Sequence, residues 1–496
     1  MKTSVKVANS KTRIFQWTLF TVILIIACAW SGCGGGSDGG TTTDSTTSPT
    51  ATSTATVSPT STATATVTPT STATATPTAT VTPSGDQGDE TDYSSITLAS
   101  GGTYSSANSG ATETKTEYTS TTADTNAIKV APGGSLTLTN SKATKSGDTA
   151  SAENSGFYGF NAGVLASSSS SSDNYTETNS TTTLTMTNCT ITTTSVGSNG
   201  AFAFGQGAVV NLDHVTINTT GGNNARGVDA TYGGTVNVTN SVITTKGDSC
   251  AALATDRYNG ATAPKINATN CTGTTAGSGS PGIYCTGTFV VKDCTLSATG
   301  SEAAVIEGKN SITLTNTSIS GVKKWGVMIY QSMSGDSSTG TGNFSMTGGT
   351  LTNGFSSGPA FFVCDTDAVI KLVGATIKNS SDMLLLAGKA STASTYIDNV
   401  NSSWGTLGGN VTFTAENQTL EGKIIICDSS SSIDLTLTNS NFKGSVNTDK
   451  ISCTAKLTID SGSTWEVTGD SYLTSLTNNG TISGSGKVYV NGVQVY

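Results

Sequence analysis

A short motif of two apolar residues followed by an asparagine recurs from residue 136 almost to the end of the chain. Each copy begins at an apolar anchor, has a second apolar residue two positions later, and in most copies has asparagine four positions later. The anchors are Leu136, Leu184, Val210, Val236, Ile266, Phe289, Ile312, Phe344, Ile370 and Leu435. From Leu184 to Ile370 they are separated by 26, 26, 30, 23, 23, 32 and 26 residues. Because one such repeat cannot bury its apolar face alone, the spacing predicts a solenoid of stacked repeats.

The alternation inside each copy predicts strands, because successive side chains of a strand point to opposite faces. In one copy, Val236 and Val238 are expected inside, and Asn237 and Thr239 outside. A second apolar strand precedes most anchors, as at Phe202–Phe204. A repeat of about two dozen residues accommodates three short strands and three turns. We therefore expect an all-β protein, a right-handed parallel β-helix of roughly 13 or 14 coils, on the order of 65 Å long.

The asparagine column predicts a turn in which each side chain bonds its own turn and the asparagine of the next coil. Its members are Asn140, Asn188, Asn240, Asn270, Asn316 and Asn439. His214, the only histidine in the chain, occupies the same column, so we interpret it as a turn residue. A Ser-His-Asp triad or a histidine general base would have to use this one residue.

The N-terminus predicts export. Lys2, Lys6, Lys11 and Arg13 precede an uncharged run, and Ser31-Gly32-Cys33 follows it. This arrangement resembles a bacterial lipoprotein signal, which implies a lipid on Cys33 and a tether to the outer membrane or cell surface. Cys28, after Ile25-Ile26-Ala27, is the alternative lipid site, and a single membrane span is the alternative to a signal. We assign residues 1–32 to the signal, 33–90 to a stalk, 91–456 to the β-helix and 457–496 to capping coils.

The stalk follows from composition. Residues 38–90 are nearly all Thr, Ser, Ala and Pro, which cannot form a packed core. The formal charge of the whole chain is −9, which argues against nucleic acid as a partner, because phosphates require clustered Lys and Arg. Only 11% of residues are charged, so the surface is expected to be neutral and polar. We expect a monomer.

Three cysteines fall five residues after an anchor: Cys189, Cys271 and Cys294. Cys271 and Cys294 belong to adjacent coils, about 5 Å apart, so they form a candidate disulfide in an exported protein. The alternative is a column of small buried thiols that replace Ser141, Ser241 and Ser440.

Carboxylates follow the second strand at Asp256, Asp365, Asp367 and Asp428. Equivalent positions line one face of a β-helix, so these residues form a candidate calcium site or a pair of catalytic acids. The alternative is ordinary turn chemistry, for which aspartate is a common residue. No other cofactor is expected.

Aromatic residues fall on or near the same strand and its following loop. Rings beside polar groups bind sugars by stacking and hydrogen bonding, whereas the alternative is packing beneath a loop. The candidate ligand-binding residues are Tyr232, Tyr258, Tyr284, Trp325, Tyr330, Gln331 and Asp365.

Two family resemblances follow from these patterns. The coils over about residues 100–490 resemble the pectate-lyase-like superfamily of right-handed β-helices. That resemblance implies a polysaccharide ligand and, in its lyases, a calcium cluster with an Arg or Lys base; Arg226 and Arg257 are the arginines available. Residues 457–482, through Trp465, Gly469 and Leu473, are similar to the passenger ends of pertactin-like autotransporters. Those passengers are β-helical surface proteins, which implies an adhesin.

We therefore expect a lipid-anchored, non-enzymatic surface protein that binds glycans or neighbouring cells. A polysaccharide lyase or glycoside hydrolase on the same scaffold is the first alternative. A purely structural envelope protein is the second.

Overall fold

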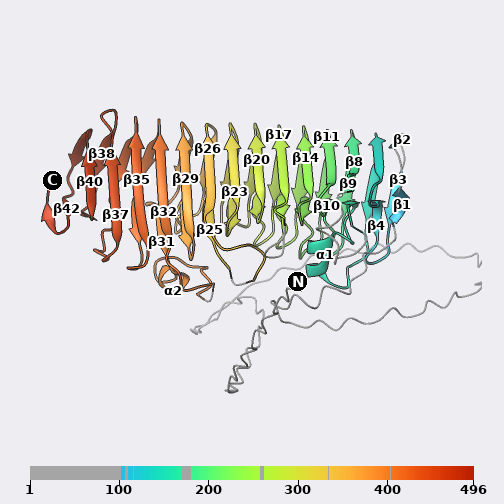
Figure 1. Ribbon diagram of the computed structural model, residues 1–496, viewed down its shortest axis with the longest axis horizontal. Helices are drawn as coiled ribbons and strands as arrows, with labels where there is room; N and C mark the ends of the chain where they lie inside the picture. Colours follow the sequence, from blue (N-terminus) through green and yellow to red (C-terminus); the bar gives the residue numbers. More distant parts are fainter. Residues whose placement is uncertain are drawn as a thin grey trace, which may run out of the picture. The chain divides into compact units, whose positions relative to one another are not determined.

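The computed structural model describes residues 102–106, 110–114, 117–169, 180–256, 262–332, 334–402 and 404–496. Within these ranges the chain is a right-handed parallel β-helix, which confirms the predicted fold (Figure 1). The predicted signal with Cys28 and Cys33 and the predicted stalk at 33–90 lie outside the described residues.

Each coil contributes strands to long parallel sheets, which we name A, B and C. Sheet A contains, in order, β1 (Gly102–Ser106), β4 (Asn126–Val130), β7 (Val164–Ser167), β10 (Ala201–Phe204), β13 (Val228–Thr231), β16 (Leu253–Thr255), β19 (Ile283–Cys285), β22 (Ala304–Glu307), β25 (Val327–Tyr330), β28 (Phe361–Cys364), β31 (Met383–Gly388) and β34 (Lys423–Ile426). Sheet B contains β2 (Gly110–Thr114), β5 (Ser135–Thr139), β8 (Thr182–Thr187), β11 (Ala208–Asp213), β14 (Thr235–Thr239), β17 (Lys265–Thr269), β20 (Thr288–Lys292), β23 (Ser311–Thr315), β26 (Gly342–Thr347), β29 (Asp367–Val373), β32 (Asn410–Glu416), β35 (Ser432–Thr438), β37 (Thr454–Ile459) and β40 (Ser475–Asn478).

Sheet C contains β3 (Glu117–Ser120), β6 (Lys142–Lys145), β9 (Thr190–Thr193), β12 (Thr216–Thr219), β15 (Val242–Thr245), β18 (Thr272–Thr275), β21 (Thr295–Ala298), β24 (Ser318–Gly321), β27 (Thr350–Asn353) and β30 (Thr376–Asn379). Towards the C-terminus two smaller sheets form, with β33 (Thr419–Glu421), β36 (Asn441–Gly444), β38 (Thr464–Val467) and β41 (Thr481–Gly484) in one, and β39 (Ser471–Leu473), β42 (Val488–Val490) and β43 (Val493–Gln494) in the other. The 14 strands of sheet B match the upper number of coils that the repeat predicts.

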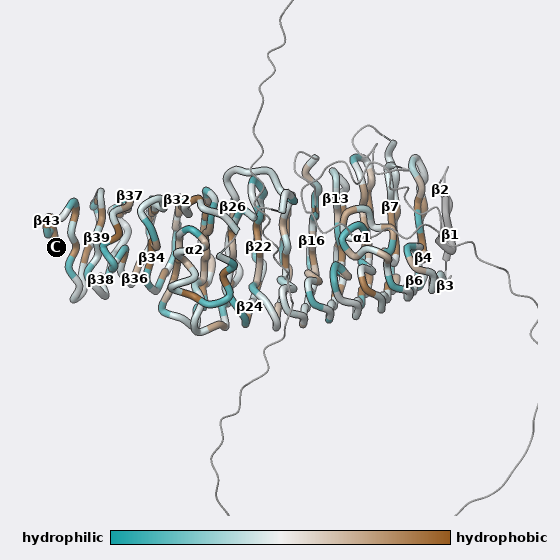
Figure 2. The backbone as a smooth tube through the Cα atoms, turned by 90° about the horizontal axis from the view of Figure 1, so that it is seen from below, coloured by the Kyte–Doolittle hydropathy of each residue, from teal (hydrophilic) through white to brown (hydrophobic). Residues whose placement is uncertain are grey.

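The predicted anchors form one continuous column in sheet B. Each pairs in register with the next from Leu136 to Ile370. Phe413 fills the gap between Ile370 and Leu435, and Leu457 extends the column. All of these side chains are buried, and they form the interior of the shaft together with the inward residues of sheets A and C. The alternation of apolar and polar residues along the strands is visible in Figure 2.

The asparagine column occupies a left-handed turn. Its asparagines have φ between 46° and 54°, and His214 has φ 53°. Asparagine tolerates this conformation better than most residues, and Gly348 and Gly374 take it without a Cβ penalty. The predicted side-chain ladder occurs in part, as in the bond from Asn270 Nδ2 to Asn240 Oδ1 at 2.8 Å. The backbone conformation, common to the whole column, is the more general reason for the repeat.

In several coils, the residue after this turn accepts a hydrogen bond from a backbone amide of the preceding coil. Ser241 Oγ accepts from the Val215 amide at 2.9 Å, and Cys294 Sγ accepts from the Cys271 amide at 3.2 Å. The same side chains donate to a carbonyl two residues earlier in the chain, as Ser241 Oγ does to Thr239 at 2.6 Å. Serine, cysteine and threonine all fit because each combines a donor, an acceptor and a small volume.

Replacing Ser440 with alanine should lower the free energy of unfolding by about 1–3 kcal/mol, because a buried amide loses its acceptor. Ser440 Oγ accepts from the Gln418 amide at 3.0 Å and donates to the Thr438 carbonyl at 2.7 Å. Ser440→Cys is the matched control, since cysteine performs this role in other coils. Chemical denaturation of both variants measures the effect, and equal losses for the two would refute this account of the column.

The outer face of sheet A is covered, whereas sheets B and C present alternating polar side chains to solvent. Near one end, α1 (Ala152–Tyr158) places Phe157 and Tyr158 over Phe202 and Phe204. Further along, the segment 389–410, which contains α2 (Ala390–Ala393), covers a second apolar cluster around Met328, Phe362 and Leu386. Sheet A is therefore buried on both sides where these two insertions lie over it.

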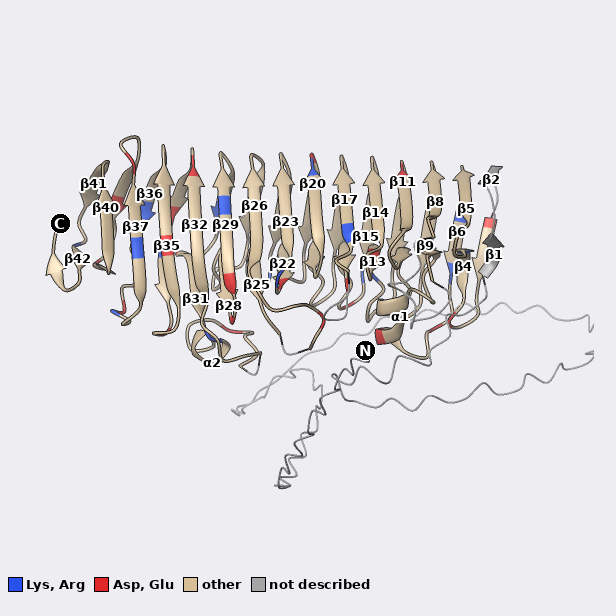
Figure 3. Ribbon diagram, viewed as in Figure 1, with Lys and Arg blue, Asp and Glu red and all other residues tan. Residues whose placement is uncertain are grey.

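Charged side chains are sparse along the shaft (Figure 3). In the part of the chain that the structure describes, no helix is both long enough and apolar enough to span a bilayer. At the C-terminal end, Trp465 is buried, stacks on Phe442 with ring centroids 6.1 Å apart, and donates to the Gly444 carbonyl at 3.1 Å. Antiparallel pairing of β42 with β43 follows and ends the parallel stack.

Candidate functional site

A groove begins at the turns between sheets A and B and continues onto the exposed face of sheet B. It consists of two adjoining hollows, which share Asp367 and Asn410. The inner hollow, of about 370 Å³, is lined by Gln331, Thr339, Gly340, Asp365, Thr366, Asp367, Lys389, Thr406, Leu407, Gly408, Asn410 and Ser430. The outer hollow, of about 420 Å³, is lined by Thr341, Asp367, Ala368, Val369, Asn410, Val411, Thr412, Ser432, Ile433, Asp434, Thr454 and Lys456.

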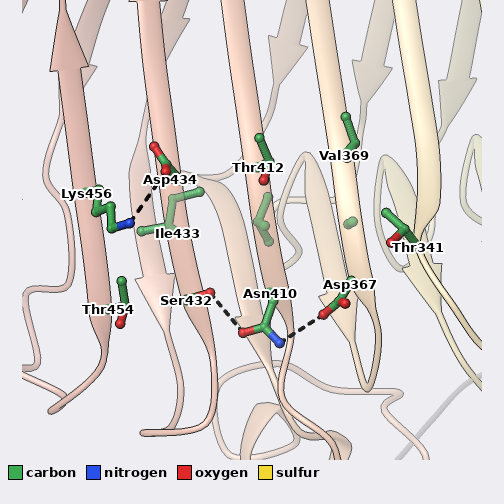
Figure 4. A pocket seen from close by; sticks show the side chains of 12 residues that line it. Thr341, Asp367, Val369, Asn410, Thr412, Ser432, Ile433, Asp434, Thr454 and Lys456 are labelled. Carbon is green, nitrogen blue, oxygen red and sulfur yellow. Dashed lines mark hydrogen bonds and ion pairs between the residues drawn. The ribbon is translucent and has the colours of Figure 1, made fainter.

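The floor of the outer hollow is a row of polar side chains at the start of neighbouring strands. Asp367, Asn410, Ser432 and Thr454 pair in register across β29, β32, β35 and β37, so they are spaced by one strand each. Asn410 Nδ2 donates to Asp367 Oδ1 at 3.0 Å, and Ser432 Oγ donates to Asn410 Oδ1 at 2.9 Å. Figure 4 shows this row with both bonds.

A second row lies two residues further along the same strands. Val369, Thr412, Asp434 and Lys456 are its members, and Lys456 Nζ lies 4.0 Å from Asp434. The side chains of both charged residues are about half exposed, so this ion pair contributes little to stability. Both groups therefore remain accessible to a ligand in the outer hollow.

Two side chains that line the inner hollow each have one fully buried oxygen without a hydrogen-bond partner. Asp365 is 2% exposed, and its Oδ2 accepts from the Ala390 amide at 3.0 Å, but its Oδ1 has no partner. Gln331 is 8% exposed, and its Nε2 donates to the Ser332 carbonyl at 3.0 Å, while its Oε1 has no partner. A buried polar atom without a partner is costly to the stability of the fold.

Burial raises the pKa of the Asp365 carboxyl, and the nearby Asp428 raises it further. Hydrogen bonding from Cys364 and from the backbone of Ala390 and Leu407 opposes this effect. Asp365 also has φ 57°, in the left-handed region that favours glycine.

The predicted ligand-binding residues separate into two groups. Gln331 and Asp365 line the inner hollow, as does Asp367 from the predicted carboxylates. Tyr232 packs against Tyr158 and Phe204 beneath α1, and Trp325 is buried against Phe362. Tyr284 and Tyr330 both donate to Glu307 Oε2 at 2.9 Å. Tyr258 lies outside the described residues.

The predicted aromatic residues that the structure describes do not form an exposed strip on the surface. The rings lie on the outer side of sheet A, where α1 and the segments that follow β25 and β31 cover them, which corresponds to the alternative of packing beneath a loop. Among the described residues, neither hollow is lined by an aromatic side chain. The groove therefore offers hydrogen bonding and charge rather than ring stacking.

The four predicted carboxylates do not form one site. Asp256 binds Arg226 Nη2 at 2.6 Å, in a coil distant from the groove. Asp428 Oδ2 accepts from the Lys389 amide, and its Oδ1 accepts from Ser430 and Ser431. Across the ranges that the structure describes, no group of three or more His, Cys, Asp or Glu side chains is arranged to hold a metal ion.

A buried charged cluster lies on the covered face of sheet A and was not predicted from the sequence. Arg226 bridges Asp229 at 2.7 Å and Asp256 at 2.6 Å, and its guanidinium lies 5.6 Å from the ring centroid of Tyr284. Glu307 is 1% exposed and accepts from Ser332 and Ser334 as well as from the two tyrosines. This cluster fastens the segment after β25 to sheet A, so its role is structural.

The candidate disulfide pair occupies the positions that the repeat predicts. Cys271 and Cys294 lie in adjacent coils, and both are free thiols in the structure. The interaction with Cys294 lowers the pKa of Cys271 to about 7 and raises that of Cys294. Cys294 Sγ accepts from the Cys271 amide, and both thiols are buried, which corresponds to the alternative interpretation of a column of small buried thiols.

Comparison with models of known protein families gives no match to this chain, and comparison with curated protein sequences gives no significant match.

Proposed function

We propose that the protein is a non-enzymatic surface protein whose β-helix binds a glycan along the groove on sheet B. The observation that carries this proposal is the row of Asp367, Asn410, Ser432 and Thr454, which continues through Asp367 and Asn410 into the inner hollow. Sugar chains present many hydroxyl groups at regular intervals. A polar row with one strand spacing, about 4.8 Å, can meet them repeatedly.

The proposed location is the outer membrane or cell surface, through a lipid on Cys33 and the extended segment 33–90. The lipoprotein-like sequence before Cys33 and the composition of residues 38–90 support this. The similarity of residues 457–482 to autotransporter passengers supports an adhesin-like role, and the similarity to the pectate-lyase-like superfamily supports a polysaccharide as the ligand. No nucleic-acid partner is proposed, and the binding unit is a monomer.

Replacing Asn410 with alanine should weaken glycan binding about 5- to 30-fold, because Asn410 joins the two hollows and its loss removes about 1–2 kcal/mol of polar contact. The full chain in detergent micelles is incubated with acidic and neutral polysaccharides, with calcium and with a chelator. Bound glycan is quantified, and mass spectrometry follows soluble oligosaccharides.

Asn267→Ala is the matched control for this experiment. Asn267 also faces outward on sheet B and donates to Asn237 at 2.8 Å, but it lies away from the groove. Release of oligosaccharides would replace the proposal with a lyase or hydrolase. Absence of binding across the panel would favour a purely structural envelope protein.

A further inference from the structure

The polar row on the floor of the groove has a fixed hydrogen-bond direction, and the ligand preference that follows from it rests on the proposed glycan function. Asp367 is exposed, and Asn410 and Ser432 are half-buried, so all three side chains are accessible from the groove. Figure 4 shows them near the start of neighbouring strands.

Asp367 fixes the orientation of its neighbours, because a carboxylate only accepts hydrogen bonds. Asn410 turns its Nδ2 atom towards Asp367 Oδ1, at 3.0 Å, and its Oδ1 atom therefore faces Ser432. An amide oxygen also only accepts, so the Ser432 hydroxyl donates its one hydrogen to Asn410 Oδ1, at 2.9 Å. The hydrogens of both bonds thus point towards Asp367.

The row presents acceptors at two of its positions. The Ser432 hydroxyl has no second hydrogen, and Asp367 Oδ2 has no hydrogen bond to any residue that the structure describes. One hydrogen of the Asn410 amide remains as a donor. A sugar hydroxyl both donates and accepts, so it can bond each of these groups, whereas a carboxylate or sulfate only accepts and cannot bond Asp367 or Ser432.

Charge favours the same kind of ligand. Asp367 is the one charged member of the row, and in the second row the positive charge of Lys456 is offset by Asp434, 4.0 Å away. Lys389 lines the inner hollow together with the carboxyl groups of Asp365 and Asp367. A hydroxyl that donates to Asp367 forms a charge-assisted bond, roughly twice as strong as a neutral one. A uronic acid or a sulfated sugar would bring a like charge to this carboxylate, which is unfavourable.

One exposed apolar side chain lies beside the row. Leu407 lines the inner hollow, is 64% exposed, and is the most exposed large apolar side chain among the described residues that line the groove. Its segment is fastened nearby, since the Gly409 amide donates to Ser431 Oγ at 3.0 Å and the Asn410 amide to the Thr366 carbonyl at 3.1 Å. The C–H face of a pyranose ring is apolar, so Leu407 supplies the apolar contact that ligand sites combine with a few polar groups.

We propose that the groove binds uncharged, hydroxyl-rich glycans, namely chains of neutral hexoses, in preference to polyuronates and sulfated glycans. Hydroxyls of one sugar donate to Asp367, hydroxyls of the following sugars bond Asn410 and Ser432, and a ring face packs on Leu407.

The test uses two matched pairs of hexasaccharides, one pair β-1,4-linked and the other α-1,4-linked. The two members of a pair differ only at carbon 6, which is a hydroxymethyl group in one and a carboxylate in the other. Binding to the full chain in detergent micelles is measured by calorimetry at about pH 7. In at least one pair, the neutral member should bind at least about tenfold more tightly than the uronate in about 0.1 M salt.

Salt separates the chemistry of the row from the general repulsion of an anion by a chain of charge −9. In about 1 M salt the Debye length falls to about 3 Å, so distant charges are screened. The hydrogen-bond mismatch at Asp367 and Ser432 remains, and the neutral member should still bind at least about fivefold more tightly.

Variants assign the preference to the row. Asp367→Asn should reduce it to within about threefold, because the asparagine oxygen accepts from Asn410 and its NH₂ group then offers a donor to the ligand. Asp293→Asn removes the same charge from an exposed turn outside the groove and should leave the preference unchanged. Leu407→Ser should weaken binding of the neutral member about three- to tenfold, whereas Val290→Ser, at an exposed position outside the groove, should not.

Equal binding of the two members in both pairs, or tighter binding of the uronates, would overturn this inference and leave the proposed glycan function in place. A preference that disappears in about 1 M salt would also overturn it, since the overall charge of the chain would then account for it. Absence of binding by all of the hexamers would remove the proposed function together with the inference.

Discussion

Replacing Arg226 with methionine should lower the free energy of unfolding by about 3–5 kcal/mol at about pH 8, because two buried carboxylates lose their cation. Arg226 is 7% exposed at its side chain and contacts Asp229 and Asp256, whose side chains are 0% and 9% exposed. Chemical denaturation at several pH values measures the effect. Lys142→Met, which removes an exposed ion pair with Glu117 at 3.8 Å, is the control and should cost less than about 1 kcal/mol.

The loss caused by Arg226→Met should shrink as the pH falls. Burial raises the pKa of Asp229 to about 7, against the opposing effect of Arg226, and burial together with Asp256 and Glu307 raises that of Asp336 to about 8. An unfolded aspartate titrates at about 3.9, so the folded protein holds more protons above about pH 4. Stability from these protonated groups is present below about pH 4 and is lost as the pH rises through about 7 to 8.

Without the cation, burial acts on Asp229 and Asp256 unopposed, so the variant should lose stability more steeply over the same interval than the wild-type protein. The deficit should be largest above about pH 8 and smallest near pH 4. A deficit that stays constant across this interval would show that Arg226 acts through packing and not through its charge.

Replacing Phe361 with alanine should lower the free energy of unfolding by about 3–5 kcal/mol, because it opens a cavity in the shaft. Phe361 is fully buried, and its ring lies edge-on to Phe344 and Phe413, with centroids 5.9 Å and 5.6 Å apart. Val290→Ala, at a side chain that is 49% exposed on sheet B, is the control and should cost less than about 0.5 kcal/mol.

Hydrogen exchange should locate the damage from Phe361→Ala. Each coil contacts mainly its neighbours, so amide protection should fall in β26, β28, β29, β31 and β32 and persist in the coils near β8 and β11. Uniform loss of protection along the whole stack would contradict this and would indicate a single cooperative unit.

The sequence predicted the register of sheet B because its apolar period is two and a slip of one residue would expose every anchor. The columns at Asn240 and Ser241 were also located correctly. Their physical reasons became clear only in the structure: a left-handed turn at the first position and an amide acceptor at the second. The copy at Phe413 was missed, since the preceding segment 389–410 lengthens its spacing from Ile370.

Only part of the groove could be predicted. Gln331, Asp365 and Asp367 were found because each follows a strand of sheet A directly or within a few residues. Asn410 and Ser432 could be recognised from the sequence only as outward-facing residues near the start of a sheet B strand, which is a weak indication. Placing them beside Asp367 requires the strand register beyond Ile370, which the structure provides.

The tyrosines show where the sequence pattern reaches its limit. The sequence placed Tyr232, Tyr284 and Tyr330 on or near one strand and its following loop, and left open whether they bind a ligand or pack beneath a loop. The answer depends on the segments that lie over these residues, here α1 and the segments after β25 and β31. The sequence by itself determined the coil, its register and its turns, because these depend on contacts between equivalent residues of successive repeats. The tertiary structure alone decided which outward faces are covered and where the groove opens, because insertions without a repeat pack by shape and not by period.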